Sequence, residues 1–187
     1  MDRPDRVTLP DLKSYLLGAI HDGTIRRRTL RISQREEEYV LRLRNLIVAN
    51  GIRAWTYKEG KTRNLFVVEF GRSLLDGHQV RSRRGVIHYV RGYFDAEGSV
   101  SNPARSEPYV YFGEKDRSDL EELRGFLESL KLHCGKIHHP SRRVDPDYWR
   151  FVVSRKSLRK FGTVVGSWHP RKERWLNALV TSVSRAE

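Results

Sequence analysis

The sequence has little cysteine and no tract that is rich in proline or glycine. Cys134 is the only cysteine among 187 residues, so the chain cannot form an internal disulfide. The 7 prolines and 14 glycines are spread along the chain, while 38% of the residues are hydrophobic and 10% are aromatic. This composition is typical of a globular protein, and the length suffices for one sizeable core or two small ones.

Long apolar runs and a secretion signal are also missing. No run approaches the roughly 18 apolar residues of a transmembrane helix, and the opening residues Met1 to Pro4 do not resemble a signal peptide. We therefore expect an intracellular protein that does not bind a membrane. Cys134 lies near His138 and His139, but the fourth ligand and the second cysteine pair of a zinc site are absent from the pattern. The two histidines are interpreted as polar strand or turn residues.

Acidic residues are few relative to basic ones. The chain holds 36 Lys and Arg against 23 Asp and Glu, which gives a net charge of +13. Such an excess favours a polyanionic partner, either a nucleic acid or a membrane surface. Membrane-binding proteins usually gather their charge on one amphipathic helix, whereas here basic residues run through the whole sequence. The distribution therefore favours nucleic acid.

What the sequence does contain is an internal repeat. Residues 15–24 (YLLGAIHDGT) and 89–99 (YVRGYFDAEGS) both read as an apolar helix followed by an acid and a glycine. Each is followed by a basic strand pair, a helix that opens with acids, a second strand pair and further helix. These elements are predicted at 24–33, 35–49, 52–59 with 64–70, and from 72 in the first half; in the second they are predicted at 98–113, 116–131, 133–139 with 147–154, and onward to the end.

The repeat predicts an α+β fold with two pseudo-symmetric αββαββα halves, residues 1–80 and 81–187, which pack through their two motif helices. The late strands support the match, because both contain the same three residues, Phe-Val-Val, at 66–68 and 151–153. Residues 77–84 are polar and basic and are predicted to link the halves.

The acids of the two motifs, Asp22 and Glu97, stand where a helix disfavours them. A helix carries partial negative charge at its C-terminus, so a carboxylate there costs roughly 0.3–1 kcal/mol. Acids elsewhere follow the rule, because Glu36 to Glu38 and Asp116 to Glu122 open helices and need no functional explanation. Asp22 and Glu97 therefore call for a compensating cation. The plain alternative is two surface acids that are paired with Lys or Arg.

Glycines and alanines accompany both acids. Gly23 and Gly98 follow the acids directly, and we expect them to take the left-handed conformation that ends a helix. Gly18, Ala19, Gly92 and Ala96 would let the two helix backbones approach closely. Close packing would bring both carboxylates to one point, where repulsion would raise one pKa unless a divalent cation neutralised them. Bound ions of this kind activate water for phosphodiester hydrolysis.

On these residues the chain resembles the LAGLIDADG homing endonucleases, specifically the monomeric type with two motifs. Residues 16–23 and 90–98 stand for the two copies. The second fits well, whereas the first is one position shorter, with four positions from Gly18 to Asp22 against five from Gly92 to Glu97.

The resemblance implies a monomeric enzyme that cleaves double-stranded DNA and needs no protein partner. It implies cleavage across the minor groove that leaves short 3′ overhangs, dependence on Mg²⁺ (Mn²⁺ or Ca²⁺ could occupy the site), and two sheets that form a saddle in the major groove. A long target site and an origin in an intron are expected of such an enzyme.

The resemblance also suggests site residues. Asp22 and Glu97, with the adjoining Gly23 and Gly98, form the predicted metal site. Gln34 matches the glutamine that borders the active site in this family, and residues 112–115 (FGEK) lack a glutamine at the corresponding place. Basic catalytic residues are predicted at Arg83 and Lys172, although each could instead be a phosphate contact or a solvated charge.

Period-two alternation in the predicted strands, together with the resemblance, selects the nucleic-acid contacts. Arginine can read guanine edges, and a two-stranded ribbon fits the major groove. The predicted contacts are Arg26, Arg28, Arg31, Ser33, Arg35, Arg53, Trp55, Tyr57, Ser101, Arg105, Tyr109, Tyr111, Lys115, Lys136, His138, Tyr148 and Arg150.

Two other functions fit the charge. One is a catalytically inactive LAGLIDADG maturase or DNA-binding regulator, which would keep the basic surface without needing both acids. The other is a basic RNA-binding or ribosomal protein, in which the duplicated acid and glycine would have no role. Because both Asp22 and Glu97 are present, the sequence favours the endonuclease.

Overall fold

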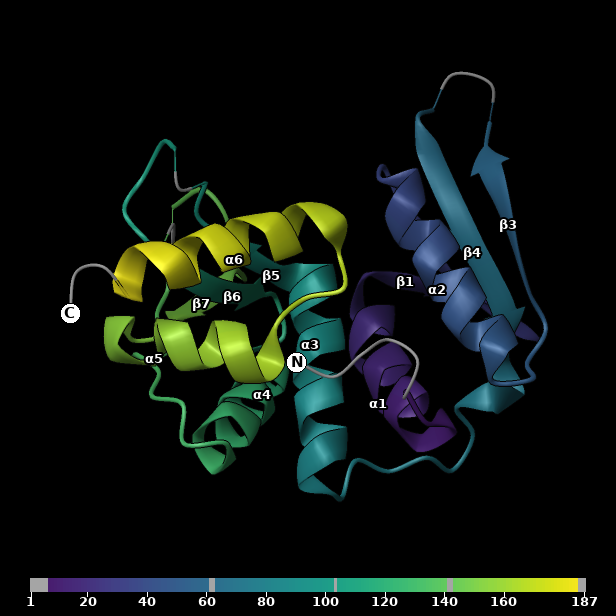
Figure 1. The fold of residues 1–187 in the computed structure, drawn as a ribbon, viewed down its shortest axis with the longest axis horizontal. Coiled ribbons are helices and arrows are strands. Elements are labelled where there is room, and N and C mark those ends of the chain that lie inside the picture. Colours follow the sequence, from purple (N-terminus) through teal and green to yellow (C-terminus); the bar gives the residue numbers. More distant parts are fainter. Residues whose placement is uncertain (1–6, 61–62, 103, 141–142, 185–187) are drawn as a thin grey trace. The chain divides into compact units, whose positions relative to one another are not determined.

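The computed structural model describes residues 7–60, 63–102, 104–140 and 143–184, with the side chains of 183 and 184 excepted. Over these residues the chain forms six α-helices and two antiparallel sheets, which confirms the α+β class (Figure 1). None of the described helices combines the length and apolarity that crossing a bilayer requires. The chain divides into two compact units, Met1–Ala96 with Trp168–Pro170, and Glu97–Ser167 with Arg171–Glu187.

The first unit contains a sheet with two helices of the first half and most of the second motif helix. Its elements are α1 (Leu9–Ala19), the 3-10 turn η2 (Ile20–Asp22), β1 (Gly23–Ile25), β2 (Thr29–Gln34), α2 (Glu37–Ala49), β3 (Ala54–Glu59), β4 (Leu65–Gly71), the 3-10 turn η3 (Arg72–Leu74) and α3 (Arg83–Glu97). The strands run antiparallel in the order β1-β2-β4-β3. The helix predicted from Arg72 is only the short turn η3, because the chain bends through Gly77 in the left-handed conformation before it reaches α3.

Strand alternation decides which face of this sheet is covered. Leu30 and Ile32 of β2 are buried in the core with Val68 and Phe70 of β4. They pack with the apolar residues of α1 and α2, which are Leu12, Tyr15, Leu16, Ala19, Tyr39, Val40, Leu43 and Ile47. The intervening residues point to the opposite face, because side chains alternate along a strand. That second face holds Arg31 beside Glu69, and Glu69 is in turn paired with Trp55.

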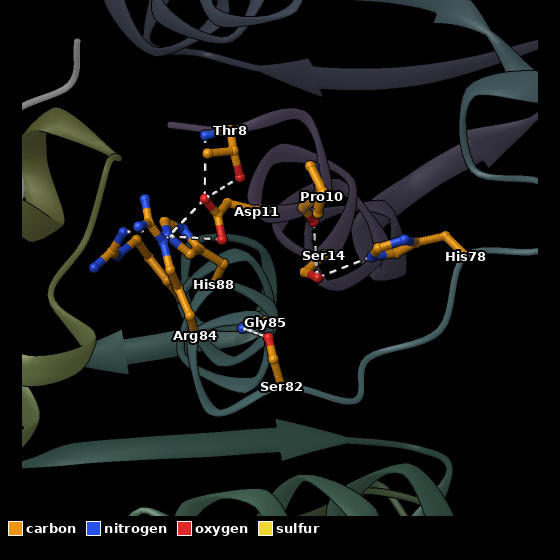
Figure 2. Close-up of polar contacts among 10 residues, drawn as sticks. Thr8, Pro10, Asp11, Ser14, His78, Ser82, Arg84, Gly85 and His88 are labelled. Carbon is orange, nitrogen blue, oxygen red and sulfur yellow. Dashed lines mark hydrogen bonds and ion pairs between the residues drawn. The ribbon is translucent and has the colours of Figure 1, made fainter. Parts of the chain in front are cut away.

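Polar contacts fix the starts of α1 and α3 (Figure 2). The Thr8 amide donates to Asp11 Oδ2 at 3.1 Å, which caps the N-terminus of α1. The same oxygen lies 3.0 Å from Nε of Arg84 in α3. Ser14 Oγ lies 2.9 Å from Nε2 of His78, which holds the linker against α1. The two helices are therefore anchored to one another at their N-terminal ends.

A short segment from late in the chain completes the first unit. The Trp168 ring stacks on Tyr15, with 4.1 Å between centroids, and its amide donates to Asp95 Oδ2 at 2.9 Å. Tyr15 donates its hydroxyl to the same carboxylate oxygen at 2.6 Å. Arg42 of α2 donates to the Trp168 carbonyl at 2.7 Å. The buried carboxylate of Asp95 thus joins α1, α3 and the segment Trp168–Pro170.

The second unit repeats the plan with a smaller sheet. Its elements are β5 (Gly98–Val100), β6 (Val110–Glu114), α4 (Arg117–Ser129), β7 (Trp149–Val152), α5 (Arg155–Lys160), the π-helical segment η4 (Phe161–Val165) and α6 (Pro170–Ser184), of which Pro170 packs with the first unit. The strand order is β5-β6-β7. The strand predicted at 133–139 is reduced to isolated bridges at Cys134 and His138. The division into sequence halves at residues 80 and 81 stays a prediction, because the compact units follow packing.

Candidate active site and nucleic-acid interface

Glycines hold the two motif helices together inside the first unit. A β-carbon on Gly18 would lie 2.1 Å from the Tyr89 carbonyl oxygen, and one on Gly92 would lie 2.0 Å from that of Tyr15. The contacts are reciprocal, since each glycine faces the carbonyl three positions before the other. Asp11 meets Arg84 near the helix starts and Gly18 meets Tyr89 further along, so α1 and α3 run in the same direction. Figure 1 shows the two helices side by side.

This reciprocity settles the register of the shorter first motif. Gly18 and Gly92 are equivalent, so the missing position falls between Gly18 and Asp22. There the chain leaves the α-helix after Ala19 and forms the 3-10 turn Ile20–Asp22, whereas α3 continues as α-helix to Glu97. One α step of about 1.5 Å and three 3-10 steps of about 2.0 Å rise about 7.5 Å, the same as five α steps. The tighter turn therefore carries Asp22 as far beyond its glycine as Glu97 lies beyond Gly92.

The glycines that follow the acids differ from the prediction. Gly23 has φ −103° and ψ 167° and begins β1, and Gly98 begins β5 without a positive φ. Neither takes the left-handed conformation, because the chain passes straight from helix into strand. Gly23 is needed for space instead, since a β-carbon there would lie 2.3 Å from Cδ1 of Ile20.

Asp22 lies beside Gln34, as the resemblance implied. Gly23 pairs with Ile32 across β1 and β2, so Asp22 reaches the end of β2 where Gln34 stands. The Gln34 amide Nε2 donates to Asp22 Oδ2 at 3.0 Å. Asp22 is exposed and Gln34 is half-buried. This hydrogen bond orients a carboxylate at the accessible end of the motif helix.

The second unit builds a related but different arrangement at Glu97. Gly98 pairs with Phe112, which makes Gly113 the counterpart of Ser33 and Glu114 the counterpart of Gln34. The hydroxyl of Tyr148 covers Gly113, where a β-carbon would lie 1.9 Å from it. Burial raises the pKa of Tyr148; the charges of Tyr111, Glu97 and Glu114 raise it further, and Arg150 opposes them.

The two basic catalytic candidates stand in the first turns of α3 and α6. Arg83 begins α3 and Glu97 ends it, so fourteen helical steps separate them by about 21 Å along the axis. Arg83 is therefore not beside Glu97, and its catalytic role stays a prediction. Lys172 lies in the first turn of α6 and is 9% exposed. Its catalytic role stays a prediction.

The open face of the first sheet is a network of charges rather than a row of free arginines. Arg31 is 8% exposed, and its NH2 donates to Glu59 Oε1 at 2.6 Å. Glu69 is also buried and accepts hydrogen bonds from Thr29 at 2.5 Å and Tyr57 at 2.9 Å. Arg31 was predicted to contact nucleic acid, but its guanidinium is committed to these carboxylates. The pairing holds the guanidinium within the sheet, and its contact with nucleic acid stays a prediction.

The open face of the second sheet is aromatic and basic. The Tyr109 and Tyr111 rings lie 5.7 Å apart, and the Arg150 guanidinium lies 5.2 Å from the centroid of Tyr111. Ser101 was predicted to contact nucleic acid, but it is 1% exposed and its hydroxyl accepts a hydrogen bond from the Tyr109 amide. Ser101 is therefore a structural residue of the turn.

The remaining predicted contacts differ in how far they reach the surface. Exposed are Arg26, Arg28, Arg35, Arg53, Trp55, Arg105, Tyr109, Lys115, Lys136 and His138, and half-buried are Ser33, Tyr57, Tyr111, Tyr148 and Arg150. Their contact with nucleic acid stays a prediction.

The donor set of the two acids suits a hard divalent cation. Asp22 is exposed and Glu97 half-buried, and carboxylate oxygens are the ligands that Mg²⁺ and Ca²⁺ prefer. Among the described residues no three His, Cys, Asp or Glu side chains gather as a metal-binding group. One or two carboxylates nevertheless suffice for Mg²⁺, which completes its coordination with water and substrate phosphate.

Comparison with known proteins agrees with this architecture. Residues 85–166 match the family model described as a LAGLIDADG-like domain. These residues are similar to a LAGLIDADG-like domain. It is also 26% identical over 195 residues to homing endonuclease I-ApeI of Aeropyrum pernix, an alignment that covers 89% of this chain and 86% of the relative. The resemblance to the LAGLIDADG homing endonucleases that the sequence motifs indicated is confirmed.

Solved structures show that the LAGLIDADG fold extends over most of the chain. I-DmoI, in complex with DNA and Mn, matches with a TM-score of 0.63 at 16% identity, over 85% of this chain and 98% of I-DmoI. Full-length DUF199/WhiA from Thermatoga maritima matches with a TM-score of 0.70 at 19% identity. That match covers 96% of this chain, which spans 62% of the WhiA chain. At these identities the likeness establishes the fold alone.

Sequence reasoning missed several residues that hold the site. Glu69 stands in an apolar strand, Leu65–Gly71, and only the register with Arg31 reveals its partner. Asp95 was not singled out, although it is an acid inside a buried helix face, which is itself a signal for a specific partner. The contact of Trp168 with Tyr15 joins positions far apart in the sequence, so no local pattern predicts it.

Proposed function

We propose that this chain is a site-specific endonuclease that hydrolyses both strands of a DNA duplex with the help of divalent cations. The observation that carries the proposal is the reciprocal packing of Gly18 and Gly92, which aligns α1 with α3 in parallel. Glu97 ends α3, and Asp22 ends the 3-10 turn that follows α1 and compensates for the shorter first motif. Two carboxylates at the same end of a helix pair would repel each other unless a cation lay between them.

The residues would divide the work as follows. Asp22 and Glu97 would hold Mg²⁺, with Mn²⁺ or Ca²⁺ as possible substitutes, and the backbones of Gly23 and Gly98 would adjoin the ions. A divalent ion bound there would activate water and stabilise the leaving oxygen. Gln34 holds one oxygen of Asp22 by its hydrogen bond and so fixes the direction of that carboxylate. I-DmoI structures that contain DNA with Mn or Ca support this choice of ions.

The net charge of +13 and the open sheet faces support DNA as the substrate. A β-ribbon fits the major groove, where exposed residues such as Arg53, Trp55 and Lys136 would meet the duplex. We further propose that the two sheets form a saddle on a long target. Cleavage would cross the minor groove and leave short 3′ overhangs. The enzyme would be a monomer of intron origin that works inside the cell on its host DNA.

The competing function is that of a catalytically inactive relative, a maturase or DNA-binding regulator. Such a protein would keep the basic sheet faces but would not need two acids at helix C-termini, nor a glutamine hydrogen-bonded to one of them. The Gln34 to Asp22 hydrogen bond therefore favours the endonuclease.

The proposal is tested by cleavage of a library of randomised duplexes, followed by sequencing of the ends. With Mg²⁺ the wild type should cut a defined sequence, and a chelator should stop it. Asp22→Asn and Glu97→Gln should abolish cleavage while DNA affinity stays within a few-fold. Asp76→Asn and Glu122→Gln remove exposed acids elsewhere and serve as matched controls that should cut normally. Cleavage that persists in both acid variants would contradict the metal assignment.

A further inference from the structure

The two half-sites differ in one chemical respect that follows from strand register. In the first unit the acid Asp22 receives a hydrogen bond from Gln34, at the end of β2. The equivalent position at the end of β6 is Glu114, which follows from the matched pairs Gly23 with Ile32 and Gly98 with Phe112. An ionised glutamate accepts hydrogen bonds and cannot donate one. Position 114 therefore supplies no amide donor in the second unit.

Another side chain, that of Tyr148, lies beside this end of β6. Position 113 is glycine where the first half has Ser33, and the Tyr148 hydroxyl occupies the space above it, 1.9 Å from where a β-carbon would be. Tyr148 directly precedes β7 and continues the alternation of Arg150 and Val152, and Arg150 pairs with Gly113. Opposed residues in an antiparallel ladder project to the same face, so Arg150 and Gly113 share one face. Glu97 ends α3 and directly precedes Gly98, whose ladder partner Phe112 adjoins Gly113.

The chemistry of the phenol fits this place. A tyrosine hydroxyl is protonated at neutral pH, so it can donate to a carboxylate or to a water bound there. The charges of Glu97 and Glu114 both raise the pKa of this hydroxyl, after burial and Tyr111. Gly113 is buried within β6, and its missing side chain is what allows the hydroxyl to enter.

We propose that Tyr148 is the positioning residue of the second half-site and takes the part that Gln34 plays in the first. It would donate a hydrogen bond to Glu97, or to the water held by that carboxylate, and so orient the group that serves one DNA strand. This inference rests on the proposed endonuclease function. It assigns Tyr148 a place next to the scissile phosphate rather than a contact on the outer part of the DNA.

Strand-specific cleavage tests the assignment. A duplex that carries the target, end-labelled on either strand, reports the cutting of each strand separately. Tyr148→Phe should slow one strand about ten- to a hundredfold, the usual effect of losing an outer-shell partner, so that nicked DNA accumulates. Gln34→Leu should slow the opposite strand. Equal slowing of both strands by Tyr148→Phe, or no slowing, would overturn the proposal.

Two further variants separate this role from a structural one. Gly113→Ala should reproduce the strand bias of Tyr148→Phe, because the new methyl displaces the hydroxyl, whereas Gly125→Ala has open space around it and should change neither strand. Glu114→Gln, added to Tyr148→Phe, supplies a donor amide as in the first half and should restore the slowed strand. If this rescue failed and Gly113→Ala cut both strands equally, the positioning role of Tyr148 would be contradicted.

A measurement that needs no cleavage distinguishes failure of this inference from failure of the proposed function. Mn²⁺ binding followed by electron paramagnetic resonance should weaken about tenfold or more in Tyr148→Phe relative to wild type. If the wild type cuts no DNA, the endonuclease proposal fails, and the Mn²⁺ titration still decides on Tyr148. Unchanged Mn²⁺ affinity in Tyr148→Phe would refute the positioning role.

Discussion

Replacing Gly18 by alanine tests the contact on which the arrangement of the acids depends. The added β-carbon would lie 2.1 Å from the Tyr89 carbonyl oxygen and 2.6 Å from the Tyr93 amide nitrogen. Both obstacles are backbone atoms of α3, so no side-chain rotation relieves the clash. Ordinary contact begins near 3.4 Å, and the oxygen alone demands that the helices separate by about 1.3 Å.

The expected loss of stability follows from two opposing effects. Alanine in place of glycine favours a helix by about 1 kcal/mol. Overpacking a well-packed core costs typically 1–3 kcal/mol and sometimes more, and this clash involves two rigid backbones. The clash should outweigh the propensity, so we expect Gly18→Ala to unfold more easily, by about 1–3 kcal/mol. Gly92→Ala, which meets the Tyr15 carbonyl oxygen at 2.0 Å, should behave alike.

Gly125 provides the matched control for this substitution. It lies inside α4 and is exposed, and a methyl group added there would have nothing within 4 Å. There only the helix preference operates, so Gly125→Ala should raise the free energy of unfolding by about 0.5–1 kcal/mol. Urea denaturation followed by tryptophan fluorescence measures both variants. The two substitutions are chemically identical and should have opposite signs.

The same substitution should also disturb cleavage. A separation of about 1 Å between the motif helices moves the acids at their ends, and misplacement on this scale can cost about a hundredfold in rate. DNA affinity should change little, because the open sheet faces do not take part in the helix contact. If Gly18→Ala stabilised the protein as Gly125→Ala does, the close contact of α1 and α3 would be refuted.

Two further predictions concern charge. The DNA affinity should fall steeply with salt, with a log–log slope near −9 if about ten phosphates are contacted, and a flat response in filter binding would contradict DNA recognition. Burial by itself would raise the pKa of Glu69, but hydrogen bonds from Thr29 and Tyr57 and the charges of Arg26 and Arg31 lower it below its ordinary value. A depressed carboxyl pKa stabilises the fold above the unfolded value, near 4.3, and this contribution is lost as pH falls through the folded value. Glu69→Gln should therefore flatten the decline of Tm between about pH 5 and pH 3, and an unchanged slope would argue against the network.

The order of elements could be predicted because it depends on local chemistry. The acids at Glu37 and Glu38 open α2 where the helix dipole favours them, and Asp116 caps α4 by accepting a hydrogen bond from the Ser118 amide at 2.8 Å. The strand pair predicted at 24–33 matches β1 and β2. These signals lie within a few residues of the elements they specify.

The parts that escaped prediction depend on register or on distant contacts. Alternation placed Arg31 on the open face, but only the pairing with Glu69 shows that the guanidinium is held there. Gly23 and Gly98 were expected to end helices in the left-handed conformation, whereas the following strands begin directly at both. The segment at Trp168 follows a π-helical stretch and packs with residues from the start of the chain, which no local pattern could indicate.

The unequal motifs have a consequence for how the two halves would act. The 3-10 turn before Asp22 matches the rise of α3, but it does not match the rotation, because 3-10 steps turn by about 120° and α steps by about 100°. From Gly18 to Asp22 the backbone turns by about 460°, and from Gly92 to Glu97 it turns by about 500°. The directions in which the two acids project from their helix axes therefore differ by about 40°. Gln34 fixes the shorter, exposed Asp22 from its strand end, while the longer, half-buried Glu97 lies near Glu114 and Tyr148. Two sites that differ in reach, direction and donor would not cut at equal rates, so an enzyme built this way should pass through a nicked intermediate in which one defined strand is broken first.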